Sequence, residues 1–362
     1  QSNTLPEVTI EAINHPSRCM FPETIITAKR NTHPSSHHQS PFPPAASNIL
    51  PLSHIFIMSS SSEVSWEVSF LQVQTSTADA ATDTLYANGH MQVPVIVTIK
   101  AIDPESATTY ELEDSDLEKI KLIDYDDENP ATEISGSWSY SATENELEHA
   151  LPTSRKEPQP DLSLTDGDPQ RKRYWVTTTK IENKRIGASI QQPDGTVVHT
   201  ASAAFDSKVT LRGINPETYT KDDLNLERND TANGDFYSPN YHWYWDQDNY
   251  FLTSTKYEFR KVQLSGYDSG STDQYLKYST GFFSVHAPCN IFYFWPMGSQ
   301  ETRTVGRGLM TTEITINQRL NAMCCTRMMF TGANPWEESY WWEGKFTIYD
   351  KFGNFGTFFY GL

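Results

Sequence analysis

The sequence predicts an all-β protein made of tandem β-sandwich domains, immunoglobulin-like or of a related type. Apolar and polar residues alternate with a period of two in many short runs, and Gly, Pro, Asn and Asp residues separate these runs. Helical periodicity is nearly absent, and a nine-residue motif occurs twice in the chain. Short strands, regular turns and a repeat of domain size together favour tandem sandwiches, with an edge-closed barrel as the alternative.

The repeated motif indicates an internal duplication. Residues 97–105 read Val-Thr-Ile-Lys-Ala-Ile-Asp-Pro-Glu, and residues 209–217 read Val-Thr-Leu-Arg-Gly-Ile-Asn-Pro-Glu. Each copy is followed by Thr-Tyr and then by an acidic segment that contains Asp-Leu. Because the spacing is close to the size of a small domain, we expect each copy to lie in a domain of its own.

Composition divides the chain into four segments. Residues 1–57 hold eight prolines and five of the ten histidines without any sustained period, so we expect a disordered leader or an over-extended gene model, with folding beginning near Ser65. An acidic β-sandwich domain follows at 58–150, a proline-rich linker at 151–170, and a larger, aromatic-rich β domain at 171–362. This last segment is either one domain or carries a divergent third β unit after residue 257.

The first sandwich is expected to begin with two strands. Residues 66–73 alternate, Asn88-Gly89 supplies a turn, and residues 91–100 form an apolar second strand. Pro94 lacks a backbone donor and should lie at an edge or a bulge. Ser115-Asp-Leu-Glu118 has the spacing of a capping box and predicts one short helical turn.

The second half repeats this order and then continues. Residues 173–180 alternate, Asp194-Gly195 marks a turn, and the second copy of the motif follows. Residues 311–316 are β-branched and alternating, which favours a strand. Residues 344–360 contain two aromatic runs around Lys351-Phe-Gly-Asn354 and predict a terminal hairpin.

The net charge of −18 is concentrated in the first predicted domain. Residues 58–150 contain about 19 acidic residues against about 3 basic ones. Nucleic acid is therefore excluded as an expected partner, because binding it relies on clustered Lys and Arg. A cation or a basic protein suits such a surface.

Four cysteines, Cys19, Cys289, Cys324 and Cys325, show no metal-ligand spacing. We expect free thiols in a reducing, cytoplasmic location, since no signal-peptide pattern is present. No apolar run approaches the roughly 20 residues that cross a bilayer, so no membrane span is expected.

No motif of a known catalytic type occurs. The chain lacks a Gly-x-Ser-x-Gly elbow, a His-Glu-x-x-His pair, a phosphate-binding glycine loop and a dinucleotide fingerprint. A catalytic triad is recognised by geometry rather than by spacing, so an enzyme stays the least supported hypothesis.

The acidic run after residue 123 is the candidate metal site. Asp124, Asp126, Asp127 and Glu128 offer the hard oxygen ligands that Ca²⁺ takes from flexible loops. An EF-hand is excluded, because the sixth position is Asn129 rather than Gly. The alternative is a solvated acidic loop. We expect no obligatory cofactor, and Ca²⁺ is the one ion this segment would take.

The densest aromatic stretch, residues 236–250, is the candidate ligand site. Tyr241, Trp243, Trp245 and Asp246 have the chemistry of a sugar site, in which rings stack on C–H faces and carboxylates bind hydroxyls. In a strand, His242 and Tyr244 point one way while Trp243 and Trp245 point the other. We therefore expect at least one of these pairs to enter the core.

Two functional hypotheses follow from these patterns. The first is a non-enzymatic β-sandwich protein that binds a protein partner or assembles with itself, supported by the surplus of aromatic residues near the C-terminus. The second is a lectin-like, carbohydrate-binding defence protein or toxin, assisted by calcium or independent of it.

Overall fold

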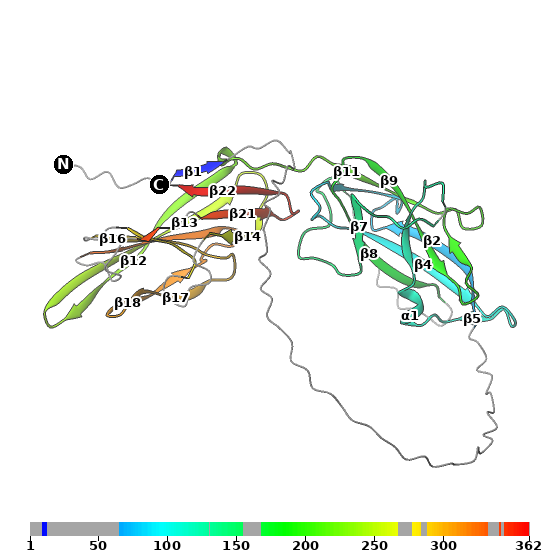
Figure 1. Cartoon of the computed structure of the whole chain (residues 1–362), viewed down its shortest axis with the longest axis horizontal. Coiled ribbons are helices and arrows are strands. Elements are labelled where there is room, and N and C mark those ends of the chain that lie inside the picture. The colour runs from blue at the N-terminus through cyan, green and yellow to red at the C-terminus, as the bar shows by residue number, and fades with distance from the viewer. Residues whose placement is uncertain are drawn as a thin grey trace, which may run out of the picture. The chain divides into compact units, whose positions relative to one another are not determined.

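The fold is all-β, with 22 strands and two short helical turns among the described residues. The computed structural model describes residues 9–12, 65–129, 131–154, 168–266, 277–283, 288–331, 340–341 and 344–361. We call residues 65–214 the first lobe, and residues 9–12 together with the described residues of 215–361 the second lobe (Figure 1). None of the helices in these ranges is long and apolar enough to cross a membrane.

The first lobe is a sandwich of two sheets. One sheet has the order β2-β4-β8-β7 with β5 beside β4, and the other has the order β10-β9-β11-β3 with β6 beside β9. Its elements are β2 (Glu67–Thr75), β3 (Thr82–Tyr86), β4 (Val93–Ile102), β5 (Thr109–Tyr110), α1 (Asp114–Leu117), β6 (Lys121–Asp124), β7 (Trp138–Ser141), β8 (Gln170–Thr178), β9 (Asn183–Gln191), β10 (Val197–His199) and β11 (Val209–Ile214).

One hydrophobic core lies between these two sheets. Strand β4 supplies five buried apolar side chains to it, and Leu85 of β3, Ile186 of β9 and Leu211 of β11 meet them from the opposite sheet. Burying such side chains stabilises the fold by about 1.5–3 kcal/mol each. Pro94 was expected at an edge or a bulge, whereas β4 lies between β2 and β8. Pro94 is opposite Trp175 of β8 but lies beyond the pairing of β4 with β2, which reaches only to Val95.

The predicted boundary between domains at 151–170 is wrong. Strand β8 pairs with β4 and β7, and β9 pairs with β6, so residues on both sides of this segment share two sheets and one core. Residues 155–167 of the predicted linker lie outside the described ranges. Proline-rich composition marks a connection but does not reveal whether it joins two domains or two strands of one domain.

The two copies of the repeated motif also lie in the same lobe. Residues 97–102 belong to β4 and residues 209–214 to β11, which are strands of the two opposite sheets. Each copy is followed by a short helical turn, α1 in one case and η1 (Lys221–Asp223) in the other. The predicted capping box at residues 115–118 falls within the first of these turns, although α1 has no side-chain cap. The local structures match, but the copies do not head separate domains, and the duplication itself stays a prediction.

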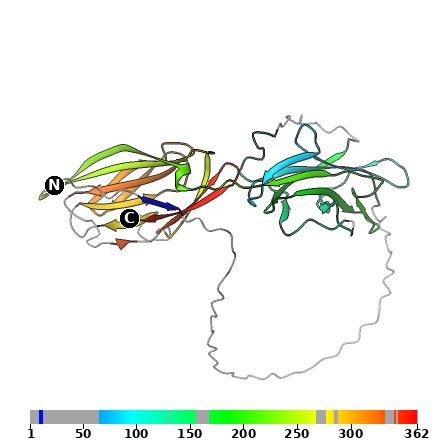
Figure 2. The same cartoon turned by 90° about the horizontal axis from the view of Figure 1, so that it is seen from above.

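The second lobe has three layers (Figure 2). A six-stranded sheet, β12-β13-β19-β16-β15-β20, packs one face on the hairpin β17–β18 and the other on the sheet β1-β22-β21-β14. Besides β1 (Thr9–Ala12), the strands of the second lobe are β12 (Leu224–Ser238), β13 (Tyr241–Ser254), β14 (Phe259–Ser265), β15 (Ser279–Phe283), β16 (Cys289–Phe294), β17 (Glu301–Arg307), β18 (Met310–Ile316), β19 (Met323–Phe330), β20 (Tyr340–Trp341), β21 (Lys345–Asp350) and β22 (Phe355–Gly361). Cys289 and Cys324 are buried free thiols, as expected, and burial raises the pKa of both.

Strand β1 (Thr9–Ala12) corrects the expectation that folding begins near Ser65. It pairs antiparallel with β22, from Thr9 opposite Gly361 to Ala12 opposite Phe358. The blue strand β1 lies beside the red strand β22 in both Figure 1 and Figure 2. The other residues of the predicted leader 1–57 lie outside the described ranges.

The predicted terminal hairpin exists, and its turn contacts the first lobe. The Asp350 carboxylate accepts hydrogen bonds from the backbone N–H groups of Phe352 and Asn354, at 2.8 and 3.0 Å, and these bonds hold the turn. Phe352 is fully buried within the core of the first lobe. Gly353 has a φ of +80°, and a Cβ there would lie 2.5 Å from Cβ of His90, so only glycine fits.

Substitution of Phe352 by Ala should lower the free energy of unfolding by about 3–5 kcal/mol, because it empties a fully buried ring site. Chemical denaturation followed by tryptophan fluorescence would measure the loss. Phe359→Ala is the matched control, since Phe359 lies in the same hairpin but is exposed, and it should cost less than about 1 kcal/mol. Equal losses in the two variants would contradict the buried position of Phe352.

Lowering the pH should weaken the fold through His90. Desolvation, followed by the charge of Lys261, lowers the pKa of this imidazole, which packs edge-on against Tyr349 and Phe355. The folded state then binds fewer protons than the unfolded state, so stability is lost as the pH falls below the ordinary histidine pKa of about 6.5. Denaturation at about pH 7.5 and about pH 5.5 should show a larger loss for the wild type than for His90→Gln. Equal losses would show that His90 does not contribute.

Candidate binding surface on the β12–β13 hairpin

Strands β12 and β13 form the longest hairpin of the described structure. They pair antiparallel from Leu224 opposite Ser254 to Ser238 opposite Tyr241, leaving the two-residue turn Pro239-Asn240. A bulge between Asp230 and Ala232 shifts the register once. Since side chains alternate along a strand, the hairpin has two faces of different chemistry.

One face carries the aromatic residues of the predicted sugar site. Trp243 and Trp245 are partly buried and pack against the core beneath β17–β18. Gly234 makes room for this packing, because a Cβ there would lie 2.7 Å from Nε1 of Trp245. Tyr241 is 60 % exposed and stacks on Trp243 with ring centroids 5.2 Å apart. The two tryptophans, one of the pairs expected to enter the core, therefore pack against it but stay partly exposed. Of the three predicted rings, Tyr241 is the one largely open to solvent.

The opposite face ends in three rings, in which Tyr237 and Tyr244 each contact His242. Tyr237 is 76 % exposed and stacks on the His242 ring at 4.4 Å, with an interplanar angle of 15°. Tyr244 is 54 % exposed, and its ring centroid lies 4.6 Å from that of His242. Asp235 Oδ1 lies 2.9 Å from His242 Nε2 and fixes the imidazole. We call Tyr237, Tyr241, His242 and Tyr244 the aromatic end of the hairpin.

Further along the same face lies a cluster of charges. Arg327 of β19 donates from Nε to Asp248 at 2.8 Å and from Nη2 to Asp246 at 2.5 Å. Arg228 of β12 donates to Asp248 at 2.8 Å. Asp248 is only 1 % exposed, and two guanidinium groups compensate its charge. Asp246, predicted to bind sugar hydroxyls, is therefore already paired with Arg327.

The cluster also holds three carboxylates close enough to share an ion. Oxygens of Asp230, Asp246 and Asp248 lie within 4.8 Å of one another. Arg327 and Arg228 already donate to this group, and a guanidinium there supplies the positive charge that a cation would bring. The arrangement fits a structural ion-pair network better than a metal site.

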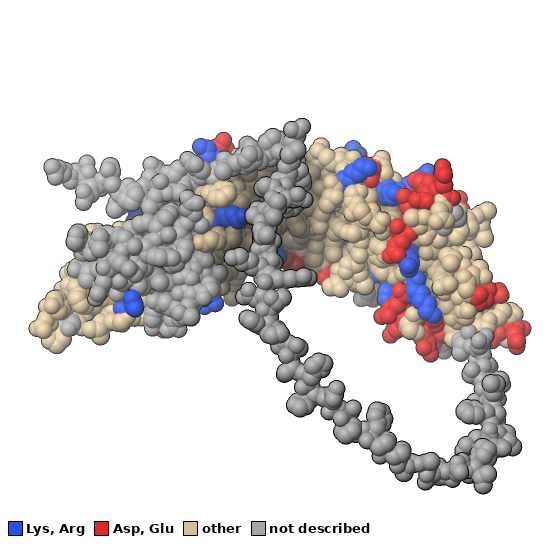
Figure 3. All heavy atoms as spheres, viewed as in Figure 1, with Lys and Arg blue, Asp and Glu red and all other residues tan. Residues whose placement is uncertain are grey.

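The predicted calcium loop is organised by ion pairs as well. Lys184 of β9 pairs with Asp124, and Arg185 donates from Nε to Asp126 at 2.8 Å. Asp127 accepts a hydrogen bond from the backbone of Asn129, and Glu128 is exposed. Among the described residues, no three of these four carboxylates lie close enough together to share an ion. Figure 3 shows red patches of Asp and Glu on the first lobe interrupted by blue Lys and Arg, so neighbouring basic residues offset part of the acidity that the sequence concentrates there.

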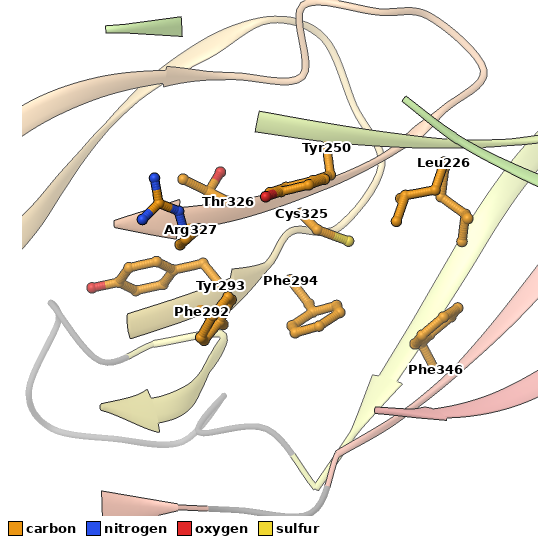
Figure 4. A pocket seen from close by; sticks show the side chains of 10 residues that line it. Leu226, Tyr250, Phe292, Tyr293, Phe294, Cys325, Thr326, Arg327 and Phe346 are labelled. Atoms are coloured by element: carbon orange, nitrogen blue, oxygen red, sulfur yellow. The ribbon is translucent and has the colours of Figure 1, made fainter. Parts of the chain in front are cut away.

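A cavity of about 20 Å³ lies beneath the cluster. Figure 4 shows the rings of Tyr250, Phe294 and Phe346 around it, with Arg327 at one end. This volume holds about one water molecule. The cavity is therefore a packing defect between two layers and is too small for an organic ligand.

Sequence reasoning missed Arg327 and the exposed side of the hairpin. Arg327 lies in the apolar run Met323–Phe330, where no local pattern reveals that it pairs with carboxylates some 80 residues away. His242 and Tyr244 were placed correctly on the face opposite the tryptophans, and Tyr237 could have joined them if the register of the hairpin had been known.

No protein-family model matches the chain, and none of the curated proteins matches it in sequence. Two solved structures overlap with most of its length. The C-terminal domain of the antigen I/II polypeptide BspA of Streptococcus agalactiae is 9 % identical, covering 80 % of this chain and 99 % of that one, with a TM-score of 0.21. The C-terminal domain of the antigen I/II-family protein AspA of Streptococcus pyogenes is 7 % identical, covering 80 % and 98 %, with a TM-score of 0.20. At such TM-scores the likeness carries no argument about this protein.

Replacing Arg327 by Ala should lower the free energy of unfolding by about 3–5 kcal/mol, because Asp248 would remain buried with one of its two partners removed. The control is Arg319→Ala, which removes an exposed pair with Glu227 at 2.7 Å and should cost at most about 1 kcal/mol. Urea denaturation of both variants gives the comparison. A loss as small for Arg327 as for Arg319 would mean that the cluster is hydrated.

Proposed function

We propose that this chain is a non-enzymatic β-sandwich protein that binds another protein, or a second copy of itself, through the aromatic end of the β12–β13 hairpin. The observation that carries the proposal is the exposure of three tyrosines near the turn of a long hairpin, Tyr237 and Tyr244 on one face and Tyr241 on the other. Tyrosine is enriched at protein interfaces, because it buries a large ring at small entropic cost and keeps a hydroxyl for hydrogen bonding.

The rings are held in place before any partner arrives. Tyr237 and Tyr244 contact His242, which Asp235 fixes, and Tyr241 lies on Trp243, which is anchored in the core. A preorganised surface loses less conformational entropy on binding than a mobile one. The lack of a catalytic motif in the sequence agrees with a role in binding.

Carbohydrate binding is the second candidate. The Tyr237 ring is 76 % exposed and stacks on His242. The carboxylate of Asp235 contacts the same imidazole, so a ring and a carboxylate are both present at this end of the hairpin. A sugar needs a free ring face for stacking. Tyr237 and Tyr241 each have one ring face on a stacking neighbour, so a sugar would use the opposite face of either ring. A protein surface can contact the exposed rings on both faces of the hairpin at once, and for this reason it is the first candidate.

The proposal is tested with a variant in which Tyr237, Tyr241 and Tyr244 are all replaced by Ala. Light scattering on the full chain over a concentration series should give a mass that rises for the wild type and stays at the monomer for the variant. A control with Leu309→Ala and Leu320→Ala removes exposed apolar side chains elsewhere in the second lobe and should behave as the wild type. Calcium or EDTA should change nothing, because the carboxylates near the hairpin are paired with arginines.

Two outcomes would contradict the proposal. If the triple variant assembles as the wild type does, the aromatic end is not the contact surface. If the wild type stays monomeric and binds a glycan array, and the triple variant loses that binding while its melting temperature is unchanged, the partner is a carbohydrate instead.

A further inference from the structure

The outer face of the first-lobe sheet β2-β4-β8-β7 carries three basic side chains close together. The odd-numbered residues of β4 point into the core, so its even-numbered residues and the residues of β8 opposite them lie on the outer face. Arg173 is opposite Ile96, and Arg171 is opposite Thr98. Lys100 follows Thr98 on the same face of β4. We call Lys100, Arg171 and Arg173 the cationic patch.

The cationic patch is not neutralised, although the chain has a net charge of −18. None of the ion pairs between described residues of this lobe includes any of its three side chains. Both arginines are exposed, and the Arg173 guanidinium lies over the Trp175 ring, 5.8 Å from its centroid. Alternate residues of a strand lie about 6.6 Å apart and diagonal neighbours about 7–8 Å, so the three charges repel one another. A bound anion would relieve this repulsion.

The floor of the cationic patch is buried and includes an unpartnered hydroxyl. Ile96 is 3 % exposed and Thr98 is 6 % exposed, although both lie outside the core. Long side chains cover such positions, and the side chains opposite Thr98 are those of Gln72 and Arg171. The Thr98 hydroxyl has no hydrogen-bond partner in the described structure. A carboxylate that entered between Gln72 and Arg171 would accept a hydrogen bond from it.

We propose that the cationic patch binds an extended acidic segment of another protein. Guanidinium groups bind carboxylates through two parallel hydrogen bonds. An extended segment places alternate side chains about 6.6 Å apart, which is also the spacing of Arg171 and Arg173 along β8. Acidic residues at alternate positions would therefore meet both arginines. Phe70, 40 % exposed and opposite Lys100, offers the segment an apolar contact.

A short acidic segment suits the cationic patch better than a long polyanion does. Three cations can compensate only a few negative charges, and the rest of a nucleic acid would face a chain with a net charge of −18. A protein segment of a few residues reaches the patch without that repulsion.

The probe is a fluorescently labelled eight-residue peptide in which Glu and Ser alternate. Its binding to the full chain is followed by fluorescence anisotropy at low salt. Arg171→Gln combined with Arg173→Gln should weaken binding at least about tenfold, because both bidentate contacts are lost. The matched control is Arg212→Gln, which removes an exposed arginine from β11 in the opposite sheet and should leave the affinity unchanged. Thr98→Val removes the hydroxyl at nearly constant shape and should also weaken binding.

Three outcomes would overturn the proposal. The first is absence of binding to the wild type, and the second is unchanged binding by the double variant. The third is tighter binding of a single-stranded oligonucleotide of equal charge, which would make the partner a nucleic acid. A peptide with the same Glu and Ser residues in two blocks should bind more weakly, and equal affinity would contradict the extended arrangement. The triple tyrosine variant of the aromatic end should bind the peptide as the wild type does, so the two proposals fail independently.

Discussion

The central six-stranded sheet of the second lobe must bury both of its faces, and much of the lobe follows from this constraint. One face meets β17–β18 and the other meets β14, β21 and β22, so each strand in the middle needs apolar side chains on both sides. Strand β13 shows how far the cover extends. Its residues Gln247, Asp248 and Asn249 are buried, whereas Tyr241, His242 and Tyr244 nearer the turn are exposed. The hairpin therefore presents rings to solvent where the covering layers end.

The buried charged residues also depend on how far the six-stranded sheet is covered. Where the apolar cover on one face gives way, Asp248 is enclosed by Arg327 and Arg228 rather than by apolar side chains. A charge in such a place persists only when it is paired and hydrogen-bonded. The carboxylates that resemble a metal site are thus explained by the guanidinium groups between them.

The strands and turns were largely predictable, because their signals are local. Alternation located the strands at 66–73, 91–100 and 311–316, and Asp194-Gly195 marked a turn in which Gly195 has a φ of +88°. Sheet membership was not predictable in the same way. The pairing of β4 with β8 joins residues separated by more than 70 positions, and it places the residues on both sides of 151–170 in one sheet and one core.

For the candidate site, too, local features were predictable and long-range contacts were not. The sequence by itself determined that the protein is all-β, that residues 236–250 are the aromatic centre of the chain, and that the two tryptophans and the pair His242 and Tyr244 occupy opposite faces. Only the tertiary structure decided which of those faces is open and that Arg327 occupies the space between Asp246 and Asp248. The physical reason is that alternation along a strand is a property of neighbouring residues, whereas burial and ion pairing depend on what the rest of the chain places against them.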